Sequence, residues 1–337
     1  MRDISKAELI TALQEHPGLL PFQIHCDTRK LEWLDLERYH IYEGFFHKAV
    51  DRFGALKHSI ANGATPLRFL SDLTVLADSA ILCQPGEPSG FIFHCGRSGS
   101  TLLTKVLARD RRHLVIGEAA AHNQVLLALT DSGRTPLQPT LAQQTIYRNL
   151  VLAMGRRRTP EYTRYFVKFT SFNVLFIDFI RSVFPTVPVI FLYRAPEQIL
   201  ASFERDPAPW LDQNQDGLRP LLRRRMKPGQ RTDTLLIKEL LADFFYAGVA
   251  MTDGVKLLNY EDLTAEHLPE ILNALNVEST EPRMRLMQTQ FAFDAKEENR
   301  ERTFSSKRTP PKPLPQEHRL AKLYRQLRES ELNIVQS

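Results

Sequence analysis

Residues 96–101 are the part of the sequence whose types and spacing are best suited to chemistry. They read Gly-Arg-Ser-Gly-Ser-Thr, between a short apolar run at residues 91–93 and a helical pattern that continues from Leu102. Two glycines allow the backbone to turn its N–H groups toward a common centre, and the helix that follows adds the positive end of its dipole. An ordinary strand-to-helix turn would need neither the glycines nor the Ser100–Thr101 pair. The sequence therefore predicts a phosphate-binding loop.

This loop does not match the nucleoside triphosphatase pattern GxxxxGK[ST]. Ser100 stands where that pattern has its Lys, and His94 stands where it has its first glycine. A later apolar run at residues 189–192 ends in Tyr193-Arg194, where such enzymes commonly place a magnesium-binding Asp. We therefore expect no metal site and no metal-assisted phosphoryl transfer.

Two segments together resemble the donor site of the sulfotransferase superfamily. Residues 97–103, RSGSTLL, are similar to its 5′-phosphosulfate loop, and residues 193–196, YRAP, followed by Ser202, are similar to its 3′-phosphate element. Residues 259–263 also resemble the family's YEDL segment, which is chiefly structural. The resemblance covers residues 90–263. The chain resembles bacterial members of the superfamily, and its motifs also resemble those of the tyrosylprotein sulfotransferases.

The resemblance implies a co-substrate, 3′-phosphoadenosine 5′-phosphosulfate (PAPS), whose sulfuryl group passes to a hydroxyl or amine acceptor. It implies that the loop holds the 5′-phosphosulfate and that Arg194 and Ser202 hold the 3′-phosphate. The family's C-terminal segment usually returns to the nucleotide, which residues 305–308 would do here without a clear motif match. The expected donor-binding residues are Arg97, Ser98, Gly99, Ser100, Thr101, Leu102, Arg194, Ser202, Ser305 and Lys307.

Sulfuryl transfer needs an in-line acceptor, stabilised charge on the leaving oxygen and a base for the acceptor proton. The resemblance implies that Lys168, at a strand end, stabilises the leaving oxygen and that Arg97 assists. Glu118 lies just past a second short strand and resembles the Glu that follows the loop helix at similar spacing in the tyrosylprotein sulfotransferases and several bacterial relatives. Partial burial there would raise its pKa toward neutrality. His122 is the rival base, because a histidine serves in the cytosolic small-molecule branch.

Short β-rich apolar runs alternate with helical patterns after residue 85, which is typical of parallel strands joined by crossover helices. The expected fold is an α/β protein with an open parallel sheet that carries the phosphate loop and is flanked by helices, so ligands should bind at the carboxyl ends of the strands. Expected strands span residues 90–94, 113–116, 164–169, 188–193 and 255–259. Expected helices span residues 101–109, 173–184, 196–204 and 234–251, with a closing helix at 316–327.

The chain divides at the turn-rich residues 85–90, which contain two prolines and two glycines. We expect residues 1–85 to form a helical N-terminal extension, with amphipathic helices at 4–13 and 36–53. Residues 86–337 are expected to form the sulfotransferase-like domain. The segment 206–233 is rich in Pro, Gly, Asp and Arg and is expected to be a loop or broken helices over the sheet.

Composition limits the class of protein. The chain has 337 residues, 43% of them hydrophobic and 25% charged, and a net charge of +5, which suits an anionic nucleotide. Its basic runs are short and lack an aromatic RNA signature, so no nucleic-acid partner is expected. Cys26, Cys83 and Cys95 suggest neither a disulfide framework nor a zinc site. With no signal peptide and no apolar run of about 18 residues, we expect a cytoplasmic protein without a membrane span.

Two other readings compete with the sulfotransferase. An atypical nucleotide-dependent kinase would require ATP and magnesium, and a non-catalytic binder of nucleotides or other anions would tolerate loss of Glu118 and Lys168. The acceptor stays open among carbohydrates, lipids, small alcohols and peptides, because variable loops, here residues 119–139 and 206–233, build acceptor pockets. The shared glutamate alone does not imply a protein-tyrosine acceptor.

Overall fold

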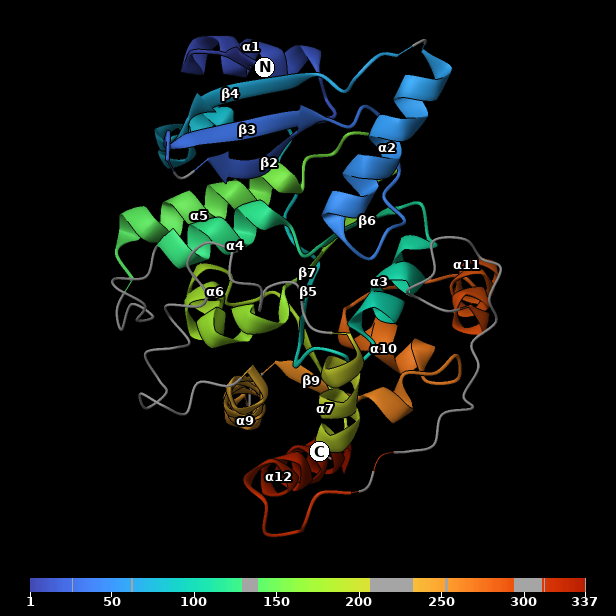
Figure 1. Ribbon diagram of the computed structural model, residues 1–337. Coiled ribbons are helices and arrows are strands. Elements are labelled where there is room, and N and C mark those ends of the chain that lie inside the picture. Colours follow the sequence, from blue (N-terminus) through green and yellow to red (C-terminus); the bar gives the residue numbers. More distant parts are fainter. Residues whose placement is uncertain are drawn as a thin grey trace.

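A five-stranded parallel sheet forms the centre of the protein in a computed structural model (Figure 1). The structure describes residues 1–25, 27–61, 63–128, 139–206, 233–251, 254–293, 311 and 313–336. The strand order is β6-β7-β5-β8-β9, and every neighbouring pair is parallel. The strands are β5 (Gly90–His94), β6 (His113–Gly117), β7 (Arg164–Lys168), β8 (Val189–Tyr193) and β9 (Val255–Asn259). The five predicted strands and the open parallel sheet are confirmed.

Helices cover both faces of this sheet, as strands buried on both faces require. Alternate strand residues point to opposite faces, so Phe91 and Phe93 pack in one cluster while Ile92 packs in the other. One face carries α4 (Ala120–Ala128), α5 (Leu141–Met154), the 3₁₀ helix η3 (Ser171–Phe176), α6 (Ile177–Val183) and α9 (Asp233–Ala250). The other carries α3 (Ser100–Ala108), α10 (Leu268–Ala274) and α11 (Glu281–Gln288).

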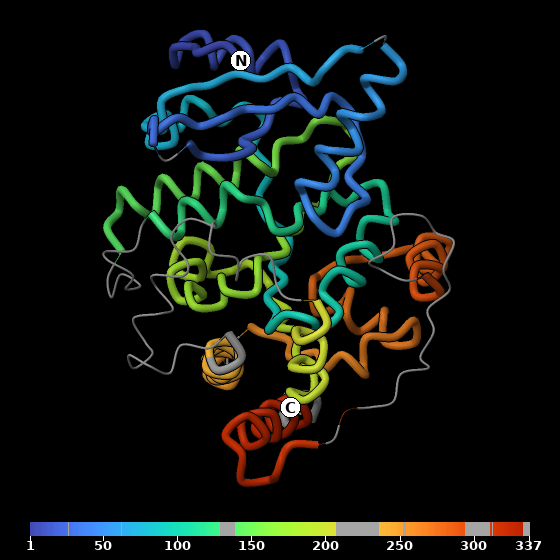
Figure 2. The backbone as a smooth tube through the Cα atoms, viewed as in Figure 1, coloured from blue at the N-terminus to red at the C-terminus, as the bar shows by residue number. Residues whose placement is uncertain are grey.

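Two more helices pack at the β9 side of the sheet. α7 (Pro196–Arg205) follows β8, and α12 (Arg319–Gln336) packs along α9 and β9. The carboxylate of Glu331 on α12 accepts hydrogen bonds from the Tyr193 hydroxyl and, at 3.1 Å, from the Asn259 amide. This helix therefore fixes the ends of β8 and β9. Figure 2 shows it at the opposite end of the molecule from the N-terminus.

The first 85 residues are not purely helical, so that expectation is wrong. They contain a second sheet of order β1-β4-β3-β2, flanked by α1 (Lys6–Glu15) and α2 (Phe46–Ile60). Its strands are β1 (Arg2–Asp3), β2 (Leu19–His25), β3 (Lys30–Asp35) and β4 (Arg68–Asp72), and two short 3₁₀ helices, η1 (Leu73–Ala77) and η2 (Ser79–Ile81), follow them.

Local pattern missed both the hairpin of β2 with β3 and the long-range pairing of β3 with β4. Trp33 lies opposite Phe69, which is far along the chain, and its indole N–H donates to the Ser71 hydroxyl at 2.9 Å. The helix expected at residues 36–53 begins only at Phe46, since the chain before it returns from the sheet. β4 therefore depends on partners, β1 and β3, that a local window does not contain, whereas β2 pairs with the adjacent β3.

The N-terminal sheet and the central sheet share buried contacts. One hydrophobic cluster includes Leu19 and Trp33 together with Leu150 and Phe91. The side chain of Gln124 on α4 pairs with both backbone groups of Ile24 on β2, accepting from its N–H at 2.7 Å and donating to its carbonyl at 2.8 Å.

Arg156 joins the two parts most directly. Its guanidinium is buried, with 1% of the residue exposed, and donates to the carbonyls of Leu13 (2.5 Å), Leu19 (3.0 Å) and Cys83 (2.7 Å). These carbonyls lie around the end of α1, the start of β2 and the entry to β5. A buried cation is stable only with such a set of acceptors.

We expect Arg156→Met to lower the free energy of unfolding by about 3 kcal/mol, because it leaves several buried carbonyls without a donor. Chemical unfolding in urea measures the change. The matched control is Arg157→Met, because Arg157 is exposed. Equal effects of the two substitutions would contradict this role for Arg156.

Candidate active site

The phosphate loop connects β5 to α3 through backbone in the left-handed region. Gly96 has φ +79°, Arg97 φ +52° and Gly99 φ +88°. A Cβ on Gly99 would lie 2.8 Å from side-chain atoms of Leu263 and Tyr260, so only glycine fits at the start of α3. The loop thus brings the N-terminal end of α3 to the carboxyl ends of β5 and β8, where anions are bound.

The hydroxyl groups of the loop play different parts. The Ser98 hydroxyl is buried and donates to the Leu192 carbonyl at 3.1 Å, so this side chain fixes the loop to β8. The Thr101 hydroxyl lies 3.5 Å from the Lys168 ammonium. The Leu102 side chain is partly buried and packs against the core cluster beneath α3. Only the backbone of Leu102 could therefore contact a bound nucleotide.

Lys168 and Glu118 form a close ion pair at the ends of β7 and β6. The Lys168 ammonium lies 2.5 Å from a Glu118 carboxylate oxygen, and the exposed fractions of the two side chains are 0% and 18%. Parallel pairing of β6 with β7 places these strand ends together. The Glu118 amide also donates to the Lys168 carbonyl at 2.8 Å. The sequence-predicted catalytic pair is therefore brought together.

The ion pair reverses the expected pKa of Glu118. Burial raises the pKa of this carboxyl, but the ammonium of Lys168 and a hydrogen bond from His94 outweigh burial and lower it to about 2. The prediction of a raised pKa was wrong because it considered burial without a partner. Glu118 also has φ +50°, a left-handed conformation that a side chain rarely adopts and that is common at functional sites.

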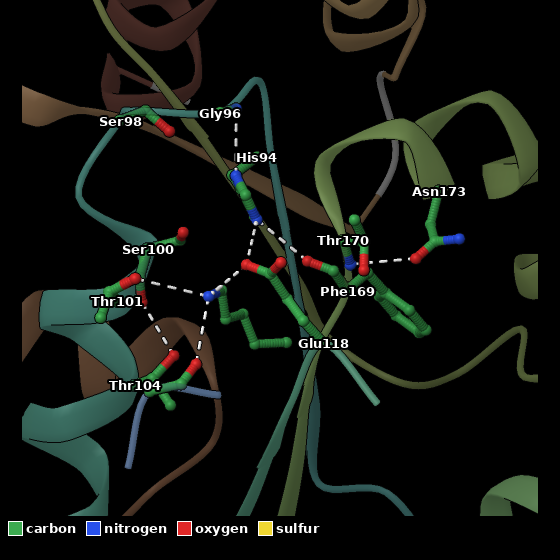
Figure 3. Close-up of polar contacts among 12 residues, drawn as sticks. His94, Gly96, Ser98, Ser100, Thr101, Thr104, Glu118, Phe169, Thr170 and Asn173 are labelled. Atoms are coloured by element: carbon green, nitrogen blue, oxygen red, sulfur yellow. Dashed lines mark hydrogen bonds and ion pairs between the residues drawn. The ribbon is translucent and has the colours of Figure 1, made fainter. Parts of the chain in front are cut away.

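His94 is a member of the site that the sequence analysis did not assign. Its Nδ1 accepts from the Gly96 amide at 3.0 Å, so its Nε2 carries the proton, which faces the Phe169 carbonyl at 2.9 Å and a Glu118 oxygen at 3.6 Å (Figure 3). Burial lowers the pKa of this imidazole and favours its neutral form. Its position two residues before Gly96 was the available signal.

His122, the rival base, lies on α4 among aromatic rings. Its centroid is 5.8 Å from that of Phe169 and 6.0 Å from that of Tyr147. Burial lowers the pKa of His122 to about 3, and its Nε2 has no hydrogen-bond partner among the described residues. It is buried with 2% of its surface exposed. This environment suits a packed core residue better than a base.

Arg194 lies beside the loop at the end of β8. Its guanidinium stacks on the Tyr260 ring at 4.0 Å from the centroid and donates to the Arg97 carbonyl at 3.2 Å and to the Gln198 side chain at 2.6 Å. Ser202 lies one turn after Gln198 on α7 and so occupies the same helix face. Tyr260 belongs to the segment that was expected to be chiefly structural, and it supports this arginine.

Arg97 points along α7. It pairs with the Asp206 carboxylate at 2.8 Å, and its guanidinium lies 5.4 Å from the Phe203 ring centroid.

Ser305 and Lys307, and most of the expected acceptor loops, lie outside the described residues. Within the described ranges, no group of three or more metal-ligating side chains occurs. Nor does any described helix combine the length and apolar character needed to cross a bilayer.

Comparison with known proteins agrees with this geometry. The model of the family described as "Sulfotransferase family" matches residues 88–281, a segment that begins just before β5 and includes the loop, Glu118, Lys168 and Arg194. A search of curated proteins finds no match. The match covers more than half of the chain, and the protein therefore belongs to the sulfotransferase family.

Proposed function

We propose that this protein transfers the sulfuryl group of PAPS to a hydroxyl or amine acceptor, with Glu118 as the base. The observation that carries the proposal is the cluster at the strand ends, where the Lys168 ammonium touches Glu118 and lies beside Thr101 of the phosphate loop. A cation, a carboxylate and an anion-binding loop within contact distance are the parts that sulfuryl transfer needs.

The donor would lie across the carboxyl ends of β5 and β8. The amides at the start of α3 and the guanidinium of Arg97 would hold its 5′-phosphosulfate. Arg194, held by Tyr260 and Gln198, would hold the 3′-phosphate together with Ser202. Burial lowers the pKa of Arg194, but an arginine remains charged near neutral pH, so this group stays cationic.

The chemical step needs little covalent work by the protein. The acceptor oxygen attacks sulfur in line, the bond from sulfur to the bridging oxygen breaks, and the product nucleotide leaves as 3′-phosphoadenosine 5′-phosphate. Lys168 would stabilise negative charge on that bridging oxygen. The acceptor proton would pass to a Glu118 oxygen.

The ion pair links the strength of the base to the position of Lys168. While Lys168 holds Glu118, the low pKa makes the carboxylate a weak base. When Lys168 instead donates to the bridging oxygen, its hold on Glu118 weakens, and the pKa of the carboxyl rises toward its usual range. The base would therefore become stronger as charge develops on the leaving group.

The kinase alternative has less support. Such an enzyme would need a cation at the loop position of Ser100 and a carboxylate near the end of β8, where Arg194 stands. Of the two expected acceptor loops, residues 129–138 and 207–232 fall outside the described ranges, and α4 occupies Ala120–Ala128.

Calorimetry with 3′-phosphoadenosine 5′-phosphate in the absence of metal tests the donor site. We expect micromolar or tighter binding, weakened at least about tenfold by Arg97→Ala and by Arg194→Ala, because each removes a charge-assisted contact to phosphate. ATP with magnesium should bind much more weakly. A clear preference for magnesium-ATP would overturn the proposal and favour a kinase.

Substitution of the two candidate bases separates them. Glu118→Gln should lower PAPS turnover about 10²- to 10⁴-fold, the usual contribution of general base catalysis. The comparison variant His122→Gln should lower it less than about tenfold. Turnover is measured as nucleotide product released from PAPS with a panel of alcohols, phenols, sugars and amines. A larger loss in the histidine variant would transfer the role to His122.

The pH dependence of kcat/KM tests the state of Glu118 in the free enzyme. With its pKa lowered to about 2, this carboxyl is already ionised throughout pH 5 to 8. Between pH 5 and 6 the ratio of wild-type to Glu118→Gln activity should therefore be flat, because donor phosphates titrate equally in both profiles. At higher pH the variant should lose further activity, because Lys168 without its carboxylate partner gives up its proton more readily. A ratio that falls as the pH drops below about 6 would show a base with the raised pKa expected from burial alone.

A further inference from the structure

The turn formed by Gly44 and Phe45 in the N-terminal part of the chain reaches the proposed catalytic lysine. The Lys168 ammonium donates to the Gly44 carbonyl at 3.2 Å and lies 4.2 Å from the centroid of the Phe45 ring. Both residues lie outside the segment matched by the sulfotransferase family, 88–281. Neither was expected from the sequence to have a part in the site.

This turn packs closely between the phosphate loop and the end of β6. A Cβ on Gly44 would lie 2.4 Å from the Thr101 side chain, and a Cβ on Gly117 would lie 2.4 Å from the Gly44 carbonyl. Two glycines are therefore required where the two parts of the chain meet.

Contacts on both sides of the turn hold it in this position. Before it, the His40 imidazole pairs with the Ala108 carbonyl at the end of α3, with its Nε2 2.9 Å from the oxygen. After it, Phe46 is buried with 1% of its surface exposed and packs against Phe22 of β2. The position of Gly44 and Phe45 is thus fixed by the fold of the N-terminal sheet.

The Lys168 ammonium needs these contacts because its side chain has no exposure to water. Burial lowers the pKa of Lys168, which disfavours its charged form, whereas Glu118 favours it. In the proposed reaction Lys168 turns from Glu118 to the bridging oxygen of the donor. A carbonyl and an aromatic face both stabilise an ammonium, and these two partners do not depend on Glu118.

We infer that Gly44 and Phe45 are positioning residues for Lys168, so that the N-terminal part of the chain completes the catalytic centre. The inference rests on the proposed function. The Gly44 carbonyl accepts a hydrogen bond from the ammonium, and the face of the Phe45 ring stabilises its positive charge. Lys168 thereby stays charged and directed at the phosphate loop when Glu118 is released.

A double-mutant cycle on the full chain tests this role, with 3′-phosphoadenosine 5′-phosphate as the probe and calorimetry without metal as the measurement. Phe45→Leu removes the aromatic face but keeps an apolar side chain, and should weaken binding about tenfold. Phe45→Tyr keeps the ring and should bind within about twofold of wild type. The matched control is Tyr246→Leu, which removes an aromatic ring that is 65% exposed on α9 and should also stay within about twofold.

The effect must act through the lysine. In a Lys168→Gln background, Phe45→Leu should change the affinity less than about twofold, because no ammonium remains for the ring to support. In the wild-type background, Phe45→Leu removes support for the charged form, which lowers the pKa of Lys168. The alkaline loss of probe binding should then move to lower pH by about one unit.

Two outcomes would overturn the inference. One is an unchanged affinity in Phe45→Leu, and the other is an equal loss in the presence and absence of the lysine, as general destabilisation would cause. Failure of the proposed function is read separately, from the wild type alone. If the wild type does not bind the probe, the proposed function and this inference both fall, whereas wild-type binding with additive substitutions overturns only the inference.

Discussion

Burial of the Lys168 ammonium is the constraint on which the rest of the site depends. A charge without access to water is stable only where several partners converge on it. Four partners come from three places in the chain: the Glu118 carboxylate after β6, the Thr101 hydroxyl on α3, and the Gly44 carbonyl and Phe45 ring before α2. The parallel pairing of β6, β7 and β5 is what allows these elements to meet.

Unusual backbone conformations gather at the same edge of the sheet. Gly96, Arg97 and Gly99 in the loop and Glu118 after β6 all have positive φ. Two of these four residues carry side chains, so their left-handed conformations cost energy that the surrounding contacts must offset. His94 links the two strained segments, since its ring accepts from the Gly96 amide and faces the Glu118 carboxylate. One buried imidazole therefore contacts both segments that have left-handed backbone.

The local sequence pattern predicted the strands of the central sheet and the candidate site residues that follow them. The five strands were confirmed because each is a short apolar run bounded by turns, and the loop was recognised because glycine spacing is a local property. In the N-terminal sheet, the pairings of β4 with β1 and β3, such as Phe69 with Trp33, join distant segments that local pattern does not relate, and the local hairpin of β2 with β3 was also missed. The pKa of Glu118 was wrongly predicted for the same reason, since its partner Lys168 lies 50 positions away along the sequence. Gly44 and Phe45 could not have been found by any rule based on spacing from the loop.

The hydrogen bonds of Arg156 have a consequence for the order in which the chain acquires its structure. They join a side chain on the central part to carbonyls as far as 143 positions earlier. A ribosome adds residues one at a time, so α1 and the N-terminal sheet emerge long before the guanidinium that satisfies their carbonyls. Contacts of such large sequence separation form slowly, and partly assembled chains expose unpaired strand edges meanwhile. During synthesis, residues 1–85 therefore need protection from aggregation until the central part of the chain, with Arg156, has followed them.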